Sequence, residues 1–425
     1  MSADLIARGM AAAQSRSAET QALARAIRTN GFFPQPSYRC PANDVATITV
    51  PAAEAPSAIN GNLVWVNQIP ITDTGRFTFL AGTADRKPAN IVWQPRGAWY
   101  SGSRQFAYFS VEFNHTGTSF EWQMVCGMMI PGVTNFRVLV DGRVSASAAV
   151  PVDGGSRYIR ITFPTAATRR IRIETSGGYH RGANAASPTE ITGTGRTYPL
   201  VTLIGDSFPE GTGQPQNWDG EGISMLRMLG MNPANASVGG TGLLNPGTGG
   251  KVNWQHAERL ADLALNGWTD QITGAAPGPA MGVVMMSVND SGLGSSYWPG
   301  SSSLQEGVNK ALWVLIDHWA AQRPGKPLVV FGPTFPNSTP PLDIYRIRDG
   351  GQEACAGAAG ANVWFIDRLA PGPILRGGVY SNAADQASLY TMGATDPTHP
   401  NPAGHTLDAL WMARQVRGLV LGEMT

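Results

Sequence analysis

The feature that most constrains the fold is a change in the spacing of apolar residues partway along the 425-residue chain. From about residue 40 to residue 175, apolar and polar residues alternate as in half-buried strands, and Asp141-Gly142 adds a tight-turn signal. The alternation is clearest over 76–80, 107–113, 136–140, 159–163 and 171–173. Many short strands with no helical stretch between them predict a β-sandwich or jelly roll.

After Pro199 the pattern changes to strands alternating with helices. Short apolar runs predict buried strands at 200–204, 281–286, 328–331 and 363–366. Helices are expected at 222–229, at 254–266, at 303–321 with Ser303 and Glu306 in capping-box spacing, and from Asn401-Pro402 onward. This order predicts a three-layer α/β unit with a parallel sheet, whose ligand site lies at the carboxyl ends of the strands.

Two further segments complete the expected organisation. Residues 4–28 carry a thin apolar stripe, which predicts a weakly amphipathic helix with Asp4 as its N-cap and an end near Asn30-Gly31. Such a helix is marginal alone, so it either packs on the body of the protein or joins copies of itself in a homo-oligomer. A stretch rich in Gly, Ser, Thr and Pro before Pro199 is expected to be a linker. The expected boundaries are 1–31 for the helix, 32–178 for the sandwich, 179–198 for the linker and 199–425 for the α/β domain.

Composition excludes several classes of function. Lys plus Arg is 31 against 30 for Asp plus Glu, a net charge of +1, so no bulk attraction to nucleic acid or an acidic membrane is expected. The cysteines Cys40, Cys126 and Cys355 lie far apart, which excludes a cysteine-built zinc site and a disulfide framework. We see no secretory signal and no apolar run long enough to span a bilayer, and so expect a soluble protein. Both a component of a phage-like particle and a cytoplasmic enzyme would suit this N-terminus.

Ser207 stands where the first strand of the α/β unit ends. The strand is apolar through Ile204 and stops at Gly205-Asp206-Ser207, which places the serine at the carboxyl edge of the sheet. Pro209 replaces the second glycine of a G-x-S-x-G elbow, so the α/β-hydrolase fold is not supported. By itself Gly-Asp-Ser more often marks only a turn.

A second group of polar residues precedes the C-terminal helix. Asp396 and His399 are three residues apart, and a carboxylate at this spacing can take the Nδ1 proton so that Nε2 acts as a base on a serine hydroxyl. Pro397 and Pro400 stiffen the backbone around them. The alternative is a capped helix start with a surface histidine. His405 is expected to be structural, and its spacing from His399 does not favour a zinc site.

Acyl transfer from a serine also needs hydrogen-bond donors for the oxyanion. Gly240 ends a glycine-rich loop and can offer an unobstructed backbone N–H, while Asn289 follows the 281–286 strand and offers a side-chain amide. Neither of these two loops alone would indicate a function. With Ser207 and the Asp396/His399 pair they form a complete acyl-transfer set.

These four blocks resemble the SGNH (GDSL) hydrolase superfamily, whose blocks carry a Ser in Gly-Asp-Ser, a Gly, an Asn in Gly-x-Asn-Asp and an Asp-x-x-His. The match covers about residues 200–420, and it implies a flavodoxin-like hydrolase domain. By this resemblance Ser207 is the nucleophile and first oxyanion donor, Gly240 the second donor, Asn289 the third, His399 the general base and Asp396 its orienting group.

One position departs from the family pattern, because Ser287 stands where the third block usually has glycine. The preceding β-rich part resembles the jelly-roll domain of several carbohydrate esterases. The resemblance therefore implies a carbohydrate O-acetylesterase that acts on an acetylated glycan without metal or organic cofactor. A lipase or thioesterase, and a non-catalytic glycan-binding or particle-attachment protein with an SGNH-like shell, are the alternatives. Trp218, Trp254, Trp268, Tyr297 and Trp298 could stack on sugar rings, although core or rim packing is the commoner role of such aromatics.

Overall fold

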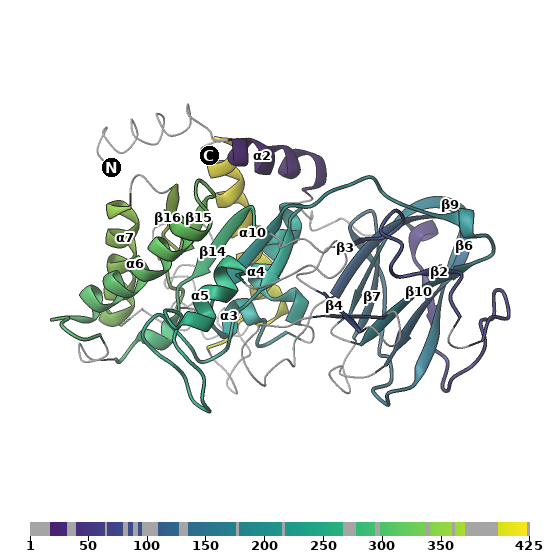
Figure 1. The fold of residues 1–425 in the computed structure, drawn as a ribbon, viewed down its shortest axis with the longest axis horizontal. Coiled ribbons are helices and arrows are strands. Elements are labelled where there is room, and N and C mark those ends of the chain that lie inside the picture. The colour runs from purple at the N-terminus through teal and green to yellow at the C-terminus, as the bar shows by residue number, and fades with distance from the viewer. Residues whose placement is uncertain are drawn as a thin grey trace.

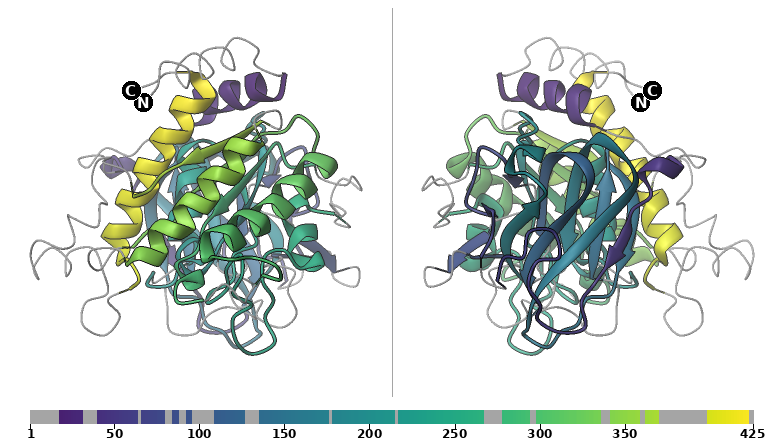
Figure 2. Two further views of the ribbon diagram at one scale, coloured as in Figure 1. Left: turned by 90° about the vertical axis from the view of Figure 1, so that its left-hand side faces the viewer. Right: turned by 90° about the vertical axis from the view of Figure 1, so that its right-hand side faces the viewer.

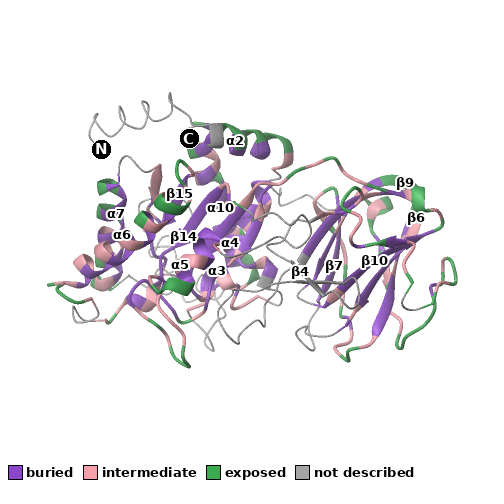
Figure 3. Ribbon diagram, viewed as in Figure 1, coloured by how far each residue is buried: buried purple, intermediate pink, exposed green. Residues whose placement is uncertain are grey.

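The fold consists of an antiparallel β-sandwich followed by a parallel five-stranded sheet with helices on both faces (Figure 1). The computed structural model describes residues 18–31, 40–63, 66–79, 84–87, 92–95, 109–126, 135–175, 178–214, 217–266, 278–293, 298–335, 341–358, 362–369 and 398–422. In Figure 3 the strands of both sheets are largely buried, so each unit has its own core. The predicted fold class is confirmed.

The sandwich is organised around two unusually long strands. Its strands are β1 (Thr47–Thr49), β2 (Ile69–Pro70), β3 (Thr78–Phe79), β4 (Ala84–Lys87), β5 (Val92–Pro95), β6 (Phe109–Val125), β7 (Phe136–Val140), β8 (Arg143–Ala148), β9 (Ser156–Thr175), β10 (Tyr179–Ala185) and β11 (Ile191–Thr192). The sequence suggested separate strands at 159–163 and 171–173, but these are parts of the 20-residue β9, which pairs with β6 on both sides of an irregularity. The register with β6 shifts between Thr162 and Ala167, where β9 is largely exposed, and the one strand continues beyond the shift.

The expected linker at 179–198 is wrong for most of its length. Its first part is strand β10, which pairs with β2, β5 and β6, and its later part contains β11. The small residues serve close packing rather than flexibility, because a Cβ at Gly182 would lie 2.1 Å from the carbonyl oxygen of Ile69. Ala183, Ala185 and Ile191 are buried in the sandwich core. The right panel of Figure 2 shows these strands as one packed unit.

The parallel sheet has the strand order β13-β12-β14-β15-β16. Its strands are β12 (Leu200–Ile204), β13 (Asn232–Asn235), β14 (Met281–Met285), β15 (Leu328–Phe331) and β16 (Val363–Ile366). In chain order this is the 2-1-3-4-5 arrangement of flavodoxin-like folds, in which ligands bind where the strand order reverses. Four of the strands lie where the sequence predicted them. The edge strand β13 was missed because Asn-Pro-Ala-Asn carries no apolar run.

Helices cover both faces of this sheet, as the left panel of Figure 2 shows. The helices are α2 (Ala18–Asn30), α3 (Ser207–Glu210), α4 (Glu221–Met228), α5 (Ala257–Ala264), α6 (Leu304–Gln322), α7 (Leu342–Gly357) and α10 (Pro402–Leu421), with short 3₁₀ turns η1 (Ala42–Asp44), η3 (Pro188–Glu190), η4 (Asn217–Asp219) and η5 (Val288–Asp290). Leu203 and Val283 pack in the cluster with α4 and α10, whereas Ile204 and Val284 pack in the cluster with α6 and α7. This alternation produces the three layers.

Helix α2 packs on the α/β unit. It contacts α10 and buries Leu23 and Ile27 in the same core cluster as α4 and α10. Its end at Asn30 agrees with the sequence, while Asp4 and the remainder of residues 1–17 lie outside the described part. The first of the two alternatives for this helix is therefore observed, and a homo-oligomer stays a prediction.

Two smaller expectations concern membrane spans and cysteines. Across the described ranges, no helix combines the length and apolar character that crossing a bilayer requires. Cys40, Cys126 and Cys355 are all free thiols.

Replacing Leu23 tests the packing of α2. Leu23→Ala should lower the free energy of unfolding by about 2–5 kcal/mol, because it leaves a cavity beside a fully buried side chain. Urea unfolding measures the change, with the exposed Arg25→Ala on the same helix as the control. Equal stability of the two variants would contradict the observed packing.

Candidate functional site

Ser207 is held at the carboxyl end of β12 by a tight turn into α3. A Cβ at Gly205 would lie 2.3 Å from Pro209 Cγ and 3.3 Å from the Met285 carbonyl oxygen, so only glycine fits there. Asp206 caps the helix by accepting a hydrogen bond from the Phe208 N–H at 3.0 Å. Pro209, which breaks the usual nucleophile-elbow pattern, is thus a packing partner of Gly205. The turn presents the Ser207 hydroxyl at the edge of the sheet.

His399 lies directly beside Ser207 although 192 residues separate them in sequence. Its Nε2 atom is 2.8 Å from Ser207 Oγ, and the Phe208 ring packs 5.4 Å from the imidazole. The following helix begins as predicted, with Asn401 Oδ1 accepting from the Gly404 N–H at 3.0 Å and proline in its first turn. A hydroxyl and an imidazole in this geometry are the core of a nucleophile and base pair.

Asp396 lies outside the described residues. Its contact with His399 therefore stays a prediction.

The loop that contains Gly240 passes close to Ser207. A Cβ at Gly239 would lie 3.4 Å from Ser207 Cβ and 2.5 Å from Glu210 Oε2, so the backbone approaches as near as glycine permits. Gly240 itself has φ +77°, a conformation that favours glycine, and it is exposed. The structure therefore brings the predicted Gly240 loop to the serine.

Two charged residues that sequence reasoning missed hold this loop. Glu210 Oε2 accepts from the Gly239 N–H at 3.0 Å, and Lys251 Nζ donates to the Gly239 carbonyl oxygen at 2.6 Å. Burial raises the pKa of Glu210 to about 7, while the Lys251 charge and the Gly239 N–H oppose that rise. The Gly239 carbonyl belongs to the same peptide group as the Gly240 N–H. Lys251 thus fixes the orientation of that N–H.

The third predicted block is joined to the first through Ser287. The Ser287 hydroxyl donates to Asp206 Oδ2 at 2.7 Å and accepts from the Asn289 N–H at 2.9 Å. Asn289 Nδ2 donates to the Thr241 carbonyl at 3.1 Å and lies 3.4 Å from Asp206 Oδ2. The serine in place of the family glycine therefore does not crowd the loop, because it supplies a hydrogen bond to each neighbour.

Asp290 fixes the chain that follows Gly240. Its buried carboxylate accepts N–H bonds at 2.9 Å from each of Leu243, Leu244 and Asn245. Burial raises the pKa of Asp290 to about 6 against the effect of these three donors. The sequence analysis gave Asp290 no role. It follows Asn289 directly, but the pattern does not show which groups it contacts.

A buried charged cluster supports the start of α10. Arg368 contacts both Glu221 and Asp408, and His405 Nε2 lies 2.9 Å from the Thr212 carbonyl oxygen. Burial raises the pKa of Asp408, whereas the charge of Arg368 overcomes the effect of burial at Glu221 and holds its pKa low. His405 is thus buried inside the protein, which agrees with its expected structural role.

The structure also bears on a zinc site and on aromatic side chains that could stack on sugar rings. The described residues contain no cluster of three or more potential metal ligands. Trp218 and Trp254 are fully buried and so cannot stack on a sugar, and Trp298 packs against the core of the α/β unit. Trp268 and Tyr297 lie outside the described residues.

Comparisons with known proteins identify the fold of the chain. Neither a family model nor a curated protein sequence matches the chain. A family two carbohydrate esterase from Clostridium thermocellum, solved in complex with cellohexaose, superposes with a TM-score of 0.55 over 82% of this chain and 100% of its own, at 14% identity. The chain has the fold of these carbohydrate esterases.

Two further solved structures show the same likeness. An acetyl xylan esterase from Butyrivibrio proteoclasticus has a TM-score of 0.53 at 13% identity, covering 83% of this chain and 98% of its own. A salicylyl-acyltransferase from a tetracycline biosynthetic pathway has a TM-score of 0.54 at 14% identity, covering 83% of this chain and 98% of its own. The predicted resemblance to carbohydrate esterases is confirmed as similarity of fold.

The raised pKa of Glu210 predicts a dependence of stability on pH. The folded protein binds a proton at Glu210 from about pH 4.5 to about pH 7 that the unfolded chain has lost, so this contribution to stability decreases as pH rises through that window. The stability of the wild type relative to Glu210→Gln should therefore fall between these pH values in urea unfolding. The exposed Glu258→Gln serves as the control. A difference between wild type and Glu210→Gln that stays constant with pH would refute the shift.

Proposed function

We propose that the chain is a serine esterase that removes acetyl groups from a carbohydrate. The observation that carries the proposal is the 2.8 Å contact between Ser207 Oγ and His399 Nε2 at the carboxyl end of a parallel sheet. The fold shared with carbohydrate esterases supports it, but at 13–14% identity that likeness concerns the fold alone. The chemistry is therefore argued from this chain's own residues.

In the proposed reaction Ser207 forms an acyl-enzyme. His399 Nε2 accepts the hydroxyl proton while Ser207 Oγ bonds to the acetyl carbonyl carbon, which gives a tetrahedral oxyanion. The bond to the sugar oxygen then breaks, and His399 returns the proton to that oxygen. His399 then takes a proton from water while the water oxygen bonds to the acyl carbonyl carbon. The bond from that carbon to Ser207 Oγ breaks, His399 returns the proton to Oγ, and acetic acid leaves and ionises to acetate. Asp396 is proposed to orient the imidazole from three residues upstream.

The oxyanion is proposed to accept hydrogen bonds from the Ser207 and Gly240 backbone N–H groups and from Asn289. The Asn289 amide has two protons, and its hydrogen bond to Asp206 at 3.4 Å is longer than that to Thr241 at 3.1 Å. The weaker contact is the one that a developing oxyanion would replace. Preorganised donors of this kind are the largest single contribution in many acyl-transfer enzymes.

The composition of two segments supports the carbohydrate assignment. Residues 209–221 follow Ser207 in the sequence and residues 291–302 follow Asn289, and both are rich in Gly, Ser and other polar residues, which favours a polar ligand over the long acyl chain of a lipase or thioesterase substrate. Acetate release from a panel of acetylated polysaccharides tests the reaction and the substrate class together. A protein that binds such glycans without releasing acetate would instead be a non-catalytic glycan-binding or particle-attachment protein.

Removing the nucleophile tests the mechanism. Ser207→Ala should lower the rate of p-nitrophenyl acetate hydrolysis by roughly 10⁴- to 10⁶-fold, and His399→Ala by a similar factor because both act in one proton transfer. Circular dichroism would establish that each variant is folded. The exposed Ser147→Ala on β8 is the matched control and should retain full activity. Retained activity in Ser207→Ala would exclude the proposed nucleophile.

Lys251 is proposed to position the Gly240 N–H through the Gly239 carbonyl. Lys251→Met should lower kcat by roughly tenfold, less than the about 10²- to 10³-fold loss that follows removal of a direct oxyanion donor. KM should change little, because the effect is confined to the transition state, and Lys251→Arg should restore part of the rate. A rise in KM with unchanged kcat would indicate instead that Lys251 binds substrate.

A further inference from the structure

The Ser287 side chain is fully buried where the loop after β14 meets the turn that carries Ser207. Its hydroxyl oxygen caps the short turn η5 by accepting from the Asn289 N–H at 2.9 Å. Its one proton goes to Asp206 Oδ2, 2.7 Å away. No step of the proposed reaction uses this hydroxyl, although it contacts residues on both sides of the site.

The Asp206 oxygen that accepts from Ser287 has a second, weaker donor. Asn289 Nδ2 lies 3.4 Å from Oδ2, whereas the Ser287 hydroxyl lies at 2.7 Å, a typical length for a strong bond from a hydroxyl to a carboxylate. Burial raises the pKa of Asp206 to about 6, and the Ser287 hydroxyl opposes that rise. At about pH 8 the carboxylate is therefore ionised and can only accept hydrogen bonds. Ser287 is its closer side-chain donor.

The Asn289 amide is oriented by its contact with Thr241. Nδ2 donates to the Thr241 carbonyl oxygen at 3.1 Å, and because a carbonyl can only accept, the nitrogen of the amide must face it. Thr241 directly follows Gly240, so this bond holds the amide next to the proposed second oxyanion donor. One amide proton is used by Thr241, and the other is available to either Asp206 or the oxyanion.

Removing the hydroxyl would make these two acceptors compete. Among the described residues, Asn289 would then be the one side chain left to donate to Asp206 Oδ2. A buried carboxylate oxygen without a donor is costly, so the second amide proton would be held by Asp206. A developing oxyanion could recruit that proton only by breaking this bond. Ser287 prevents the competition because it already satisfies Oδ2.

We propose that Ser287 is a positioning residue that satisfies the Asp206 carboxylate and so leaves an Asn289 amide proton for the oxyanion. This inference rests on the proposed function, because the proton is used in the acyl-transfer transition state. It gives a role to the serine that stands where the family pattern has glycine. Ser287 would act on catalysis through Asn289, without contacting the substrate.

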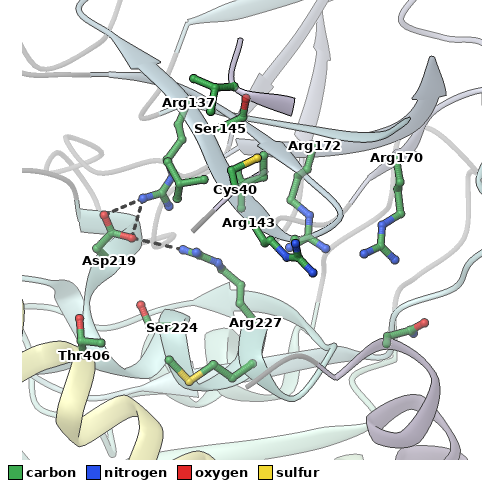
Figure 4. Close-up of a pocket in the computed structure, with 16 residues that line it drawn as sticks. Cys40, Arg137, Arg143, Ser145, Arg170, Arg172, Asp219, Ser224, Arg227 and Thr406 are labelled. Carbon is green, nitrogen blue, oxygen red and sulfur yellow. Dashed lines mark hydrogen bonds and ion pairs between the residues drawn. The ribbon is translucent and has the colours of Figure 1, made fainter. Parts of the chain in front are cut away.

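Hydrolysis of p-nitrophenyl acetate at about pH 8 tests this role. Ser287→Ala removes the hydroxyl and keeps the Cβ, and it should lower kcat roughly tenfold with little change in KM, because the affected contact forms only in the transition state. Ser287→Gly should show a similar loss. Ser224→Ala is the matched control and should retain full activity. Ser224 lies on α4 and lines a cavity of about 560 Å³ beside the sandwich (Figure 4), and Ser207 and Asn289 do not line that cavity.

A double-mutant cycle separates positioning of the amide from general support of the loop. Asn289→Ala should lower kcat by roughly 10²- to 10³-fold, as expected for a direct oxyanion donor. Adding Ser287→Ala to that variant should cost no more than about a further twofold, because the proton that Ser287 keeps available is already gone. A purely structural role would instead lower kcat by the same factor in both backgrounds.

Crystal structures of the wild type and Ser287→Ala give a readout that does not depend on activity. The distance from Asn289 Nδ2 to Asp206 Oδ2, 3.4 Å in the wild type, should shorten in the variant to about 3 Å. If Ser287→Ala does not fold, Ser287→Gly replaces it in each comparison. A wild type that hydrolyses no ester would refute the proposed function itself. With an active wild type, full kcat in the folded variant, independent losses in the cycle, or an unchanged distance would each overturn the role of Ser287 alone.

Discussion

The carboxylate of Asp206 joins the loops that meet at the end of the parallel sheet. It accepts hydrogen bonds from the Phe208 N–H and the Ser287 hydroxyl, and Asn289 Nδ2 lies within reach of it. Burial raises the pKa of Asp206 to about 6, although its hydrogen bonds favour the ionised form. An unpaired carboxylate would be costly in this position, so the loops after β12 and β14 must adopt the arrangement that supplies its donors. That arrangement places Ser207 where His399 can reach it.

Sequence patterns predicted the parts of this site that depend on local position. Ser207 lies where an apolar strand ends, and His399 lies just before a helix with an asparagine cap and a proline in its first turn, so both positions follow from element boundaries. Glu210 and Lys251 could not be found in this way, because their role arises from contacts with the Gly239 peptide that only the tertiary fold creates. The proposed role of Asp396 still rests on its spacing from His399.

The strands were predicted best where apolar side chains cluster in the sequence. They were predicted least well where backbone contacts determine the structure. The buried strands β12, β14, β15 and β16 carry clear apolar runs. Edge strand β13 is held by pairing with β12 despite its polar sequence. In the expected linker the glycine and alanine residues suggested flexibility, but at Gly182 a side chain would collide with β2. Small residues are ambiguous in sequence, because they fit both loops and close-packed strands.

The central claim is that Ser207 is a nucleophile activated by His399. Mass spectrometry of the protein after treatment with a fluorophosphonate tests it directly, because the reagent forms a stable bond with an activated serine. The account predicts one adduct, mapped to the peptide that contains Ser207, and loss of that adduct in His399→Ala. An adduct on another serine, or equal labelling of Ser207 without His399, would contradict it.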